Sequence, residues 1–398
     1  MSDLLMHFIG KEVKVKKFKI ISGIIVLLIV LLSVNHVLAE DSKKDTGKMI
    51  DEMAALYMDN MKIPGLAIAI SMPDGKVVEK YYGKANIEYD APVEKDTIFP
   101  IGSLSKTYTA IAIMLLNEQG KLNVNDTITK YFPDCAAWEK ITIKNLMQHT
   151  SGIQSITAVE PFCSNQMKDW KPEEVVAILK PLKLDFEPGT NAQYSNSGCI
   201  LLAMIVEKVS GMMYNDFLQK NIAGPLGMKH TMFVSNRIIV SKRASGYMTV
   251  DGKTQNAEYA STLAPFGSGG IISNVTDILK LKDAFRPGKI LKKESIDEMF
   301  ATTKLNNGGD YITPGPIGTT YGYCLETLIA PDGKTVPGKA GAISGFKSQF
   351  YYFKDSDIFI AITANLDMLS PAVGEKLKGF KMMDCPLLMS LQLFKIVK

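Results

Sequence analysis

Short apolar runs at both ends of the chain predict the strands of one sheet. Residues 65–72 are almost all apolar and lie between two turns that contain Pro and Gly. They therefore predict a buried strand, with residues 76–82 as its hairpin partner. Residues 347–353 alternate with aromatic side chains and residues 357–364 are rich in isoleucine, which predicts a second pair of strands. The sheet is expected to combine N-terminal and C-terminal segments.

The residues between these strands have helical periodicity. Apolar positions spaced three and four residues apart begin near Ser103 and end at Gly120, and residues 197–209 form the clearest helix. A last helix is expected to begin at Ser370. The pattern predicts an α/β (α+β) fold, in which an antiparallel sheet flanked by helices is interrupted by a mostly helical insertion of about residues 110–265.

The first 39 residues have the pattern of an export signal. Five lysines give residues 1–39 a net charge of +3, and they precede the almost uninterrupted apolar run of residues 20–34. Small residues near Ala39 provide a cleavage position, so we expect a signal peptide that is removed after Ala39. The alternative is a retained membrane anchor, because the apolar run is nearly long enough to span a bilayer. In both cases the rest of the chain is expected to be secreted or to lie in the cell envelope.

Two further segments flank the expected domain of residues 50–380. Residues 40–49 are polar and predict a linker, whereas residues 381–398 are rich in leucine. This apolar tail is expected either to pack on the domain or to contact a membrane or a partner.

Composition and charge exclude several classes of protein. Apolar residues make up 46% and charged residues 22% of the 398 residues, which is ordinary for a globular protein and excludes a wholly disordered chain. The formal net charge is +4, and most of it lies in residues 1–39, so no nucleic-acid partner is expected.

Cysteine and histidine are too scattered to predict a metal centre. The five cysteines are widely spaced and lack a Cys-x-x-Cys motif, so they predict neither a disulfide framework nor a zinc site. Cys135 and Cys163 remain a candidate pair after export, although buried free thiols are the simpler expectation. After residue 39 the chain has two histidines, His149 and His230, and a Ser-His-Asp triad would have to use one of them. No metal and no other cofactor is expected.

Ser103 and Lys106 form a Ser-x-x-Lys motif at the start of a predicted helix. Residues three apart lie on one helical face, so the amine can reach the hydroxyl and act as the base that a serine nucleophile requires. The positive end of the helix would also favour a developing oxyanion at Ser103. A second match, Ser344 to Lys347, enters a predicted strand, where residues three apart point to opposite faces, and is rejected.

Two further motifs follow along the chain, each at a predicted element boundary. Tyr194-Ser195-Asn196 precedes the helix of residues 197–209, and a phenol near a lysine can shuttle a proton while an amide can hold a substrate carbonyl. Lys339-Ala340-Gly341 precedes the strand from residue 347, and a glycine there permits close backbone approach. Each motif is weak alone, because a half-buried turn tyrosine or a solvated lysine beside a turn gives the same pattern.

The combination of Ser-x-x-Lys, Tyr-x-Asn and Lys-x-Gly resembles the three signatures of the serine β-lactamase and penicillin-binding-protein superfamily. Five flanking segments resemble, more closely, its group of class C β-lactamases, D-Ala-D-Ala carboxypeptidases and esterases. They are Ile63–Gly65, Leu146–Gly152, Phe186–Gly189, Pro225–Met228 and Gly269–Ser273. The resemblance covers roughly residues 50–380 and implies the fold of this superfamily.

The resemblance also implies the catalytic roles. Ser103 looks like the acylated nucleophile, Lys106 like its base partner, and Tyr194 like the residue that exchanges protons with the serine and the leaving group. The backbone N–H groups of Ser103 and Ala342 resemble an oxyanion hole. His149 resembles a structural residue that braces the loop before the substrate cleft.

Asn196, Lys339 and Gly341 resemble positions that bind the substrate. Ala340 departs from the family pattern, because true β-lactamases and peptidases usually carry a hydroxyl residue there. Without this hydroxyl, one hydrogen-bond donor to a substrate carboxylate is missing. We therefore rank D-Ala-D-Ala carboxypeptidase-type or esterase activity above β-lactamase activity. The expected function is an exported serine hydrolase that acts on an amide or ester of a small molecule or peptide. The alternative is a catalytically weak binding or assembly protein that retains the fold.

Overall fold

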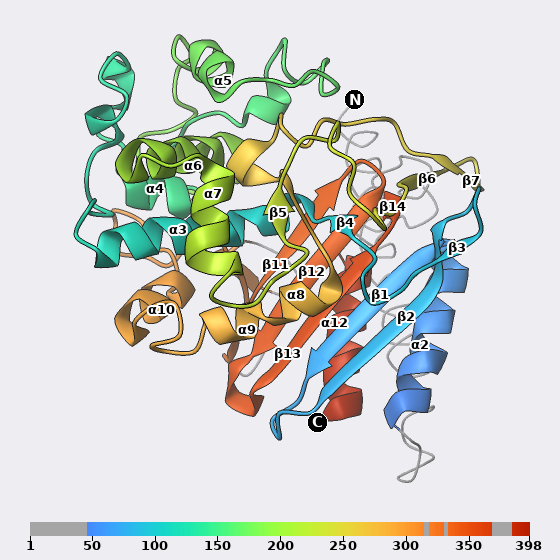
Figure 1. The fold of residues 1–398 in the computed structure, drawn as a ribbon. Coiled ribbons are helices and arrows are strands. Elements are labelled where there is room, and N and C mark those ends of the chain that lie inside the picture. The colour runs from blue at the N-terminus through green and yellow to red at the C-terminus, as the bar shows by residue number, and fades with distance from the viewer. Residues whose placement is uncertain (1–45, 314–317, 330–332, 368–383) are drawn as a thin grey trace, which may run out of the picture.

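An eight-stranded antiparallel sheet forms the centre of the computed structural model, which describes residues 46–313, 318–329, 333–367 and 384–398 (Figure 1). Its strands are β1 (Gly65–Ser71), β2 (Val77–Asn86), β3 (Ala91–Pro92), β9 (Gly318–Tyr321), β10 (Glu326–Ile329), β11 (Thr335–Ile343), β12 (Phe346–Phe353) and β13 (Ile358–Ala364). The order is β3-β2-β1-β13-β12-β11-β10-β9. Leu66 of β1 lies opposite Ala364 of β13, so the N-terminal and C-terminal strands pair directly. The predicted α/β (α+β) fold is confirmed.

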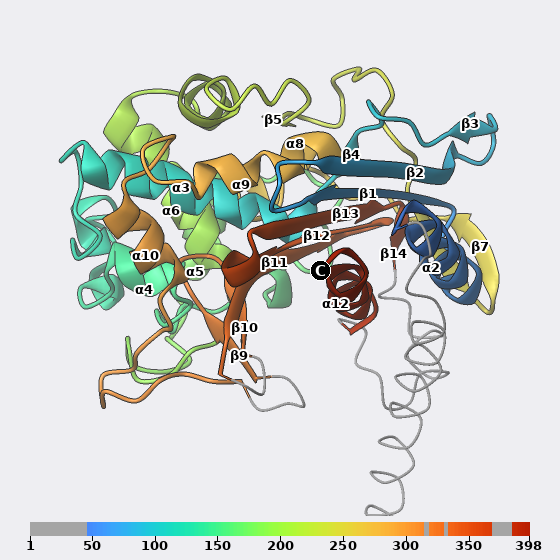
Figure 2. The same ribbon diagram turned by 90° about the horizontal axis from the view of Figure 1, so that it is seen from below.

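Helices cover both faces of this sheet. α2 (Thr46–Met61) and α12 (Asp384–Val397) lie on one face, and α8 (Val275–Leu279) and α9 (Leu281–Ala284) lie on the other (Figure 2). All seven residues of β1 and of β13 are buried between the two layers, which explains their continuous apolar sequences.

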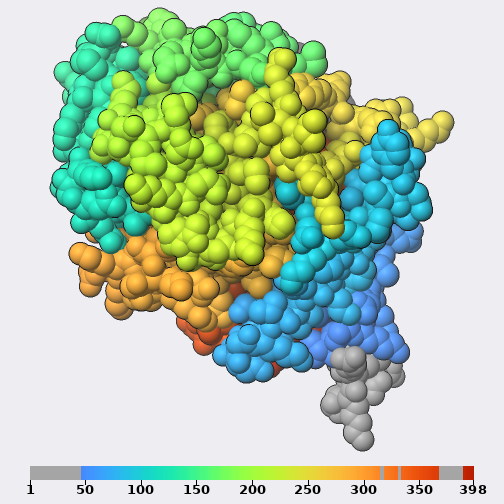
Figure 3. All heavy atoms as spheres, viewed as in Figure 1, coloured from blue at the N-terminus to red at the C-terminus, as the bar shows by residue number. Residues whose placement is uncertain are grey.

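Residues 110–265 are mostly helix and loop, and Figure 3 shows them, in teal to yellow, packed against the blue N-terminal strands. The helices of this part and its flanks are α3 (Ser105–Glu118), α4 (Ile143–Met147), α5 (Pro172–Leu179), α6 (Asn196–Ser210), α7 (Tyr214–Leu218) and α10 (Lys293–Phe300). The short strands are β4 (Phe99–Pro100), β5 (Met232–Phe233), β6 (Tyr247–Val250), β7 (Lys253–Asn256), β8 (Ile271–Ser273) and β14 (Leu366–Asp367). Buried side chains of α3 and α6 form much of the core between them.

Two expected boundaries differ in the structure. The helix expected from Ser103 begins with a 3₁₀ turn, Gly102–Leu104, and α3 follows it. Residues 46–49 belong to α2 rather than to the linker expected over residues 40–49, because this helix buries Ile50 against the sheet. Residues 1–39 and the helix expected from Ser370 lie outside the described residues.

The apolar tail packs on the domain as α12. The ring of Phe394 stacks on that of Phe353 in β12, with centroids 4.0 Å apart, and Leu393 is completely buried. The Tyr57 hydroxyl of α2 donates a hydrogen bond to Gln392 at 3.1 Å. The tail was expected either to pack on the domain or to contact a membrane or a partner, and in the structure it packs on the domain.

Within the described ranges, no single helix is both long and apolar enough to cross a membrane. One pair of segments, Asn196–Ser210 and Tyr214–Ala223, reaches the required length and composition together but is bent by 79°. The first of these is α6, whose apolar side chains lie in the core.

Candidate active site

Ser103 lies in the 3₁₀ turn between β4 and α3, where two glycines allow this turn and β11 to touch. Gly102 has a φ of +50°, and an added Cβ would lie 2.6 Å from the Ala342 carbonyl oxygen. A Cβ on Gly341 would lie 2.1 Å from the carbonyl oxygen of Ile101. Because no other residue fits these positions without displacing backbone, the two segments can approach this closely. The structure thus places Ser103 and Ala342, the predicted oxyanion-hole residues, in adjoining segments.

Lys106 is completely buried one helical turn after Ser103. Its Nζ donates hydrogen bonds to Ser103 Oγ at 3.1 Å, to Asn196 Oδ1 at 2.7 Å and to the Ser268 carbonyl at 2.6 Å. Three acceptors match the three protons of an ammonium group. In the neutral amine the first contact can reverse, so that the serine hydroxyl donates to Nζ, which is the arrangement needed to remove its proton.

The Tyr194 ring lies close to two lysine ammonium groups. The Nζ atoms of Lys106 and Lys339 are 4.9 and 4.7 Å from the centroid of the ring. Cation–π attraction operates at such distances and holds the ring against both amines. Tyr194 therefore belongs to the same group of side chains as Ser103, as predicted.

Asn196 is the first residue of α6, and its side-chain amide is held at both ends. Its Oδ1 accepts from Lys106, and its Nδ2 donates to Thr157 Oγ1 at 3.1 Å. These contacts fix the orientation of the amide beside Ser103. Thr157 was not predicted, because nothing in the sequence relates its loop to α6.

Lys339 is completely buried in β11 and forms an ion pair with Glu326 of β10, with 2.5 Å between Nζ and Oε1. Burial alone lowers the pKa of the Lys339 ammonium. The neighbouring Glu326 carboxylate more than offsets this lowering and holds the pKa of Lys339 above its ordinary value. Lys339 is therefore charged at neutral pH. Sequence analysis missed Glu326, because its place depends on the pairing that sets Glu326 opposite Gly338.

His149 lies beside the site without reaching Ser103. Its Nδ1 accepts from the Ser195 backbone N–H at 3.3 Å, and its ring centroid is 4.7 Å from that of Tyr194. Burial, aided by the nearby ammonium groups of Lys339 and Lys106, holds the pKa of His149 well below its usual value. The imidazole is therefore neutral, and its contacts with Ser195 and Tyr194 are compatible with the structural role that the resemblance implied.

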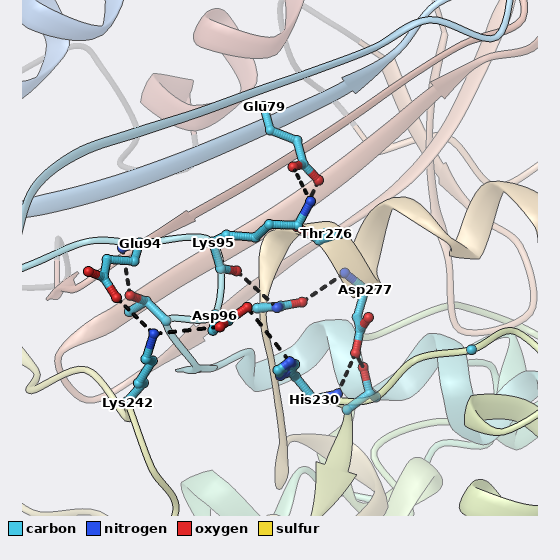
Figure 4. Close-up of polar contacts among 12 residues, drawn as sticks. Glu79, Glu94, Lys95, Asp96, His230, Lys242, Thr276 and Asp277 are labelled. Atoms are coloured by element: carbon cyan, nitrogen blue, oxygen red, sulfur yellow. Dashed lines mark hydrogen bonds and ion pairs between the residues drawn. The ribbon is translucent and has the colours of Figure 1, made fainter.

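His230 belongs to a separate group of charged side chains around α8 (Figure 4). Its Nε2 is 4.0 Å from Asp96 Oδ1, and its backbone N–H donates to Asp277 at 2.6 Å. Lys242 pairs with Glu94 at 2.9 Å in the same group. Neither histidine of the described residues hydrogen-bonds to Ser103, so a Ser-His-Asp triad has no support in this geometry.

A family model described as Beta-lactamase matches residues 50–376. The chain belongs to the beta-lactamase family. A penicillin-binding protein of Bacillus subtilis (strain 168) is 27% identical to this chain over 288 residues, and the match covers 69% of this chain and 62% of that protein. A beta-lactamase of Providencia stuartii is 29% identical over 347 residues, which cover 80% and 87% of the two chains. This chain therefore spans less than two thirds of the length of the first of these relatives.

A solved structure shows that other proteins share the fold of this beta-lactamase-family chain. The D-amino acid amidase from Ochrobactrum anthropi SV3 superposes on this chain with a TM-score of 0.75, covering 89% of this chain and all of that one. Its sequence is 24% identical, so the likeness establishes the fold. The members of this family with which the chain is compared have a serine-hydrolase fold.

Proposed function

We infer that this beta-lactamase-family chain is a serine hydrolase that forms an acyl-enzyme on Ser103. The observation that carries the proposal is the 3.1 Å contact between Ser103 Oγ and the Nζ of the buried Lys106. A serine hydroxyl becomes an effective nucleophile when a base lies within hydrogen-bond reach, and this contact provides one.

The reaction uses side chains and backbone alone. As Ser103 Oγ bonds to the substrate carbonyl carbon, its proton passes to the Lys106–Tyr194 pair, and the N–H groups of Ser103 and Ala342 stabilise the oxyanion. The pair then returns the proton to the departing amine or alcohol. Water attacks the acyl-enzyme, which releases the acid and restores Ser103. No cofactor enters these steps.

The proposed substrate is an amide or ester without a carboxylate beside the scissile bond. Ala340 supplies no hydroxyl, and Glu326 already pairs with the charge of Lys339. Both features weaken recognition of the carboxylate that β-lactams and D-Ala-D-Ala peptides carry. We therefore rank esterase or amidase activity first, D-Ala-D-Ala carboxypeptidase-type activity second and β-lactamase activity last.

Covalent labelling tests the nucleophile. The protein is treated with a p-nitrophenyl ester or a fluorescent penicillin, and the acyl-enzyme is detected by intact-protein mass spectrometry. Ser103→Ala should abolish the adduct. Ser344→Ala is the matched control, because Ser344 also begins a Ser-x-x-Lys sequence but donates to the Glu258 carbonyl at 2.6 Å. An adduct that persists in Ser103→Ala would contradict the proposal, and a folded protein that no probe labels would favour the binding or assembly protein.

We also propose that residues 1–39 export the enzyme to the cell envelope or the medium. The basic and apolar pattern of this segment supports the proposal. The mass of the mature protein tests it, because cleavage would leave Glu40 as the first residue. A full-length chain in the membrane fraction would indicate an anchor, and a full-length chain in the cytoplasm would contradict export.

A further inference from the structure

Two cysteine side chains meet between the segments that carry Asn196 and Glu326. The Sγ atoms of Cys199 and Cys324 are 3.2 Å apart, although the residues are 125 positions apart in the sequence. Cys199 lies in α6, one turn after Asn196, and Cys324 lies in the turn between β9 and β10, two residues before Glu326. Both side chains are completely buried in the main apolar core. The proposed mechanism uses neither.

The backbone holds Cys324 in a specific position. Its N–H donates to the Met147 carbonyl at 2.7 Å, and its φ is +55°. This left-handed conformation is adopted more readily by glycine than by cysteine. A cysteine therefore occupies a position that favours glycine, and its sulfur contacts that of a second cysteine.

The two cysteines that sequence spacing had offered as a pair are arranged differently. Cys135 and Cys163 are free thiols in this structure. The Sγ of Cys163 donates instead to a carboxylate oxygen of Glu160 at 2.8 Å. Among the described cysteines, the contact between Cys199 and Cys324 is the one with the sulfur atoms adjacent.

We propose that Cys199 and Cys324 form a disulfide when the chain folds under oxidising conditions, and that the two thiols are its reduced state. The S–S bond forms at about 2.05 Å, so the two sulfur atoms have to move about 1.2 Å closer than their present separation of 3.2 Å. The two thiols lose two electrons and two protons. A low-molecular-weight disulfide such as oxidised glutathione accepts them and becomes two thiols.

Burial determines when this bond can form. Neither side chain is exposed, so a dissolved oxidant cannot reach the two thiols once the chain has folded. The bond therefore forms during folding, before α6 and the β9–β10 turn close over the sulfur atoms. Once formed, the same burial protects it from reductants.

Oxidative refolding of the full chain tests the proposal. The protein is unfolded in guanidinium with a reductant and diluted into either a glutathione redox buffer or reductant alone. It is then alkylated with iodoacetamide under denaturing conditions. Of its five cysteines, the oxidised sample should carry three alkyl groups and the reduced sample five. Proteolysis should yield a peptide pair joined through Cys199 and Cys324, and the Tm of the oxidised form should be about 3–7 °C higher.

Two matched variants locate the effect. Cys199→Ser should abolish the difference in Tm between the two samples, whereas Cys135→Ser should preserve it. The mass measurement on the unaltered chain decides the matter even if Cys199→Ser misfolds. Five alkylated cysteines after oxidative refolding, or a bridge between any other pair, would overturn the proposal. Because the readouts are mass and Tm, the result is independent of whether Ser103 is acylated.

Discussion

Replacing Lys339 with methionine would leave Glu326 as an unpaired carboxylate in the sheet. Methionine keeps most of the volume of the lysine stem and removes its charge. The Lys339 side chain is 1% exposed and that of Glu326 is 17% exposed, so water can reach the remaining carboxylate only in part. Removing one partner of a buried ion pair costs about 3–5 kcal/mol, and the partial exposure of Glu326 places this substitution near 3 kcal/mol.

That cost can be measured as a shift in Tm. The unfolding entropy is about 2.1 cal/mol/K per residue. Over the family-matched residues 50–376, about 1 kcal/mol then corresponds to roughly 1.5 °C, and Lys339→Met should lower Tm by about 4–5 °C. The control is Lys339→Met with Glu326→Met, which should recover most of the loss because apolar side chains replace the whole pair. A single variant as stable as the parent, or a double variant with no recovery, would refute the reasoning.

The same variant has a defined dependence on pH. The folded-state pKa of Lys339 is raised, so the stability that the pair contributes is fully present below the unfolded-state pKa of about 10.4. This contribution is lost only as the pH rises from there through the higher folded-state pKa. The difference in Tm between the parent and Lys339→Met should therefore be constant from about pH 7 to pH 9.

Kinetics with two substrates connect the ion pair to function. Because Glu326 already pairs with Lys339, the substitution should lower kcat/KM similarly for a D-Ala-D-Ala peptide and for a neutral p-nitrophenyl ester. If Lys339 instead binds the substrate carboxylate, a lost charge-assisted hydrogen bond would make the loss on the peptide about ten- to a hundredfold larger. That result would restore carboxypeptidase-type activity as the preferred function.

Two further predictions concern the neighbouring side chains. Lys106→Ala and Tyr194→Phe should each lower kcat by at least about a hundredfold. The double variant should be little worse than either single variant, because the two residues transfer the same proton. Independent, multiplicative losses would indicate another base. Because the folded-state pKa of His149 is depressed, the free energy of unfolding should fall by about 1.4 kcal/mol per pH unit as the pH drops below about 6.5. This dependence can be measured by urea titrations between pH 7 and pH 5. His149→Asn should remove the slope of the unfolding free energy against pH, and His230→Asn should keep it. An unchanged slope in His149→Asn would mean that another group takes up the proton.

The sequence predicted the parts of the fold whose patterns are set locally. β1 and β13 were predicted because burial on both faces leaves a continuous apolar run, and α6 because its apolar positions persist over four turns. β9 and β10 were not predicted, since each has four residues with mixed polarity and becomes a strand only by pairing with its neighbour.

The residues of the candidate site also divide into those that the sequence could predict and those that it could not. Ser103, Lys106, Tyr194, Asn196 and Lys339 carry their own chemical signature, and the structure brings these side chains together. Glu326, Thr157 and the Ser268 carbonyl have no such signature. Their contacts follow from strand register and loop packing, which depend on the whole chain.

The direct pairing of β1 with β13 also sets the order of events during synthesis. Leu66 meets its partner, Ala364, 298 positions later in the chain. At a rate of about 5–20 residues per second, a ribosome needs roughly 15–60 s to cover that distance. Throughout this interval β1 can pair with β2 but its other edge lacks β13, and Ser103 lacks the strand that carries Ala342. The central sheet and the predicted oxyanion hole therefore cannot be completed until nearly the whole domain has been made, so a nascent chain is hydrolytically inactive until then.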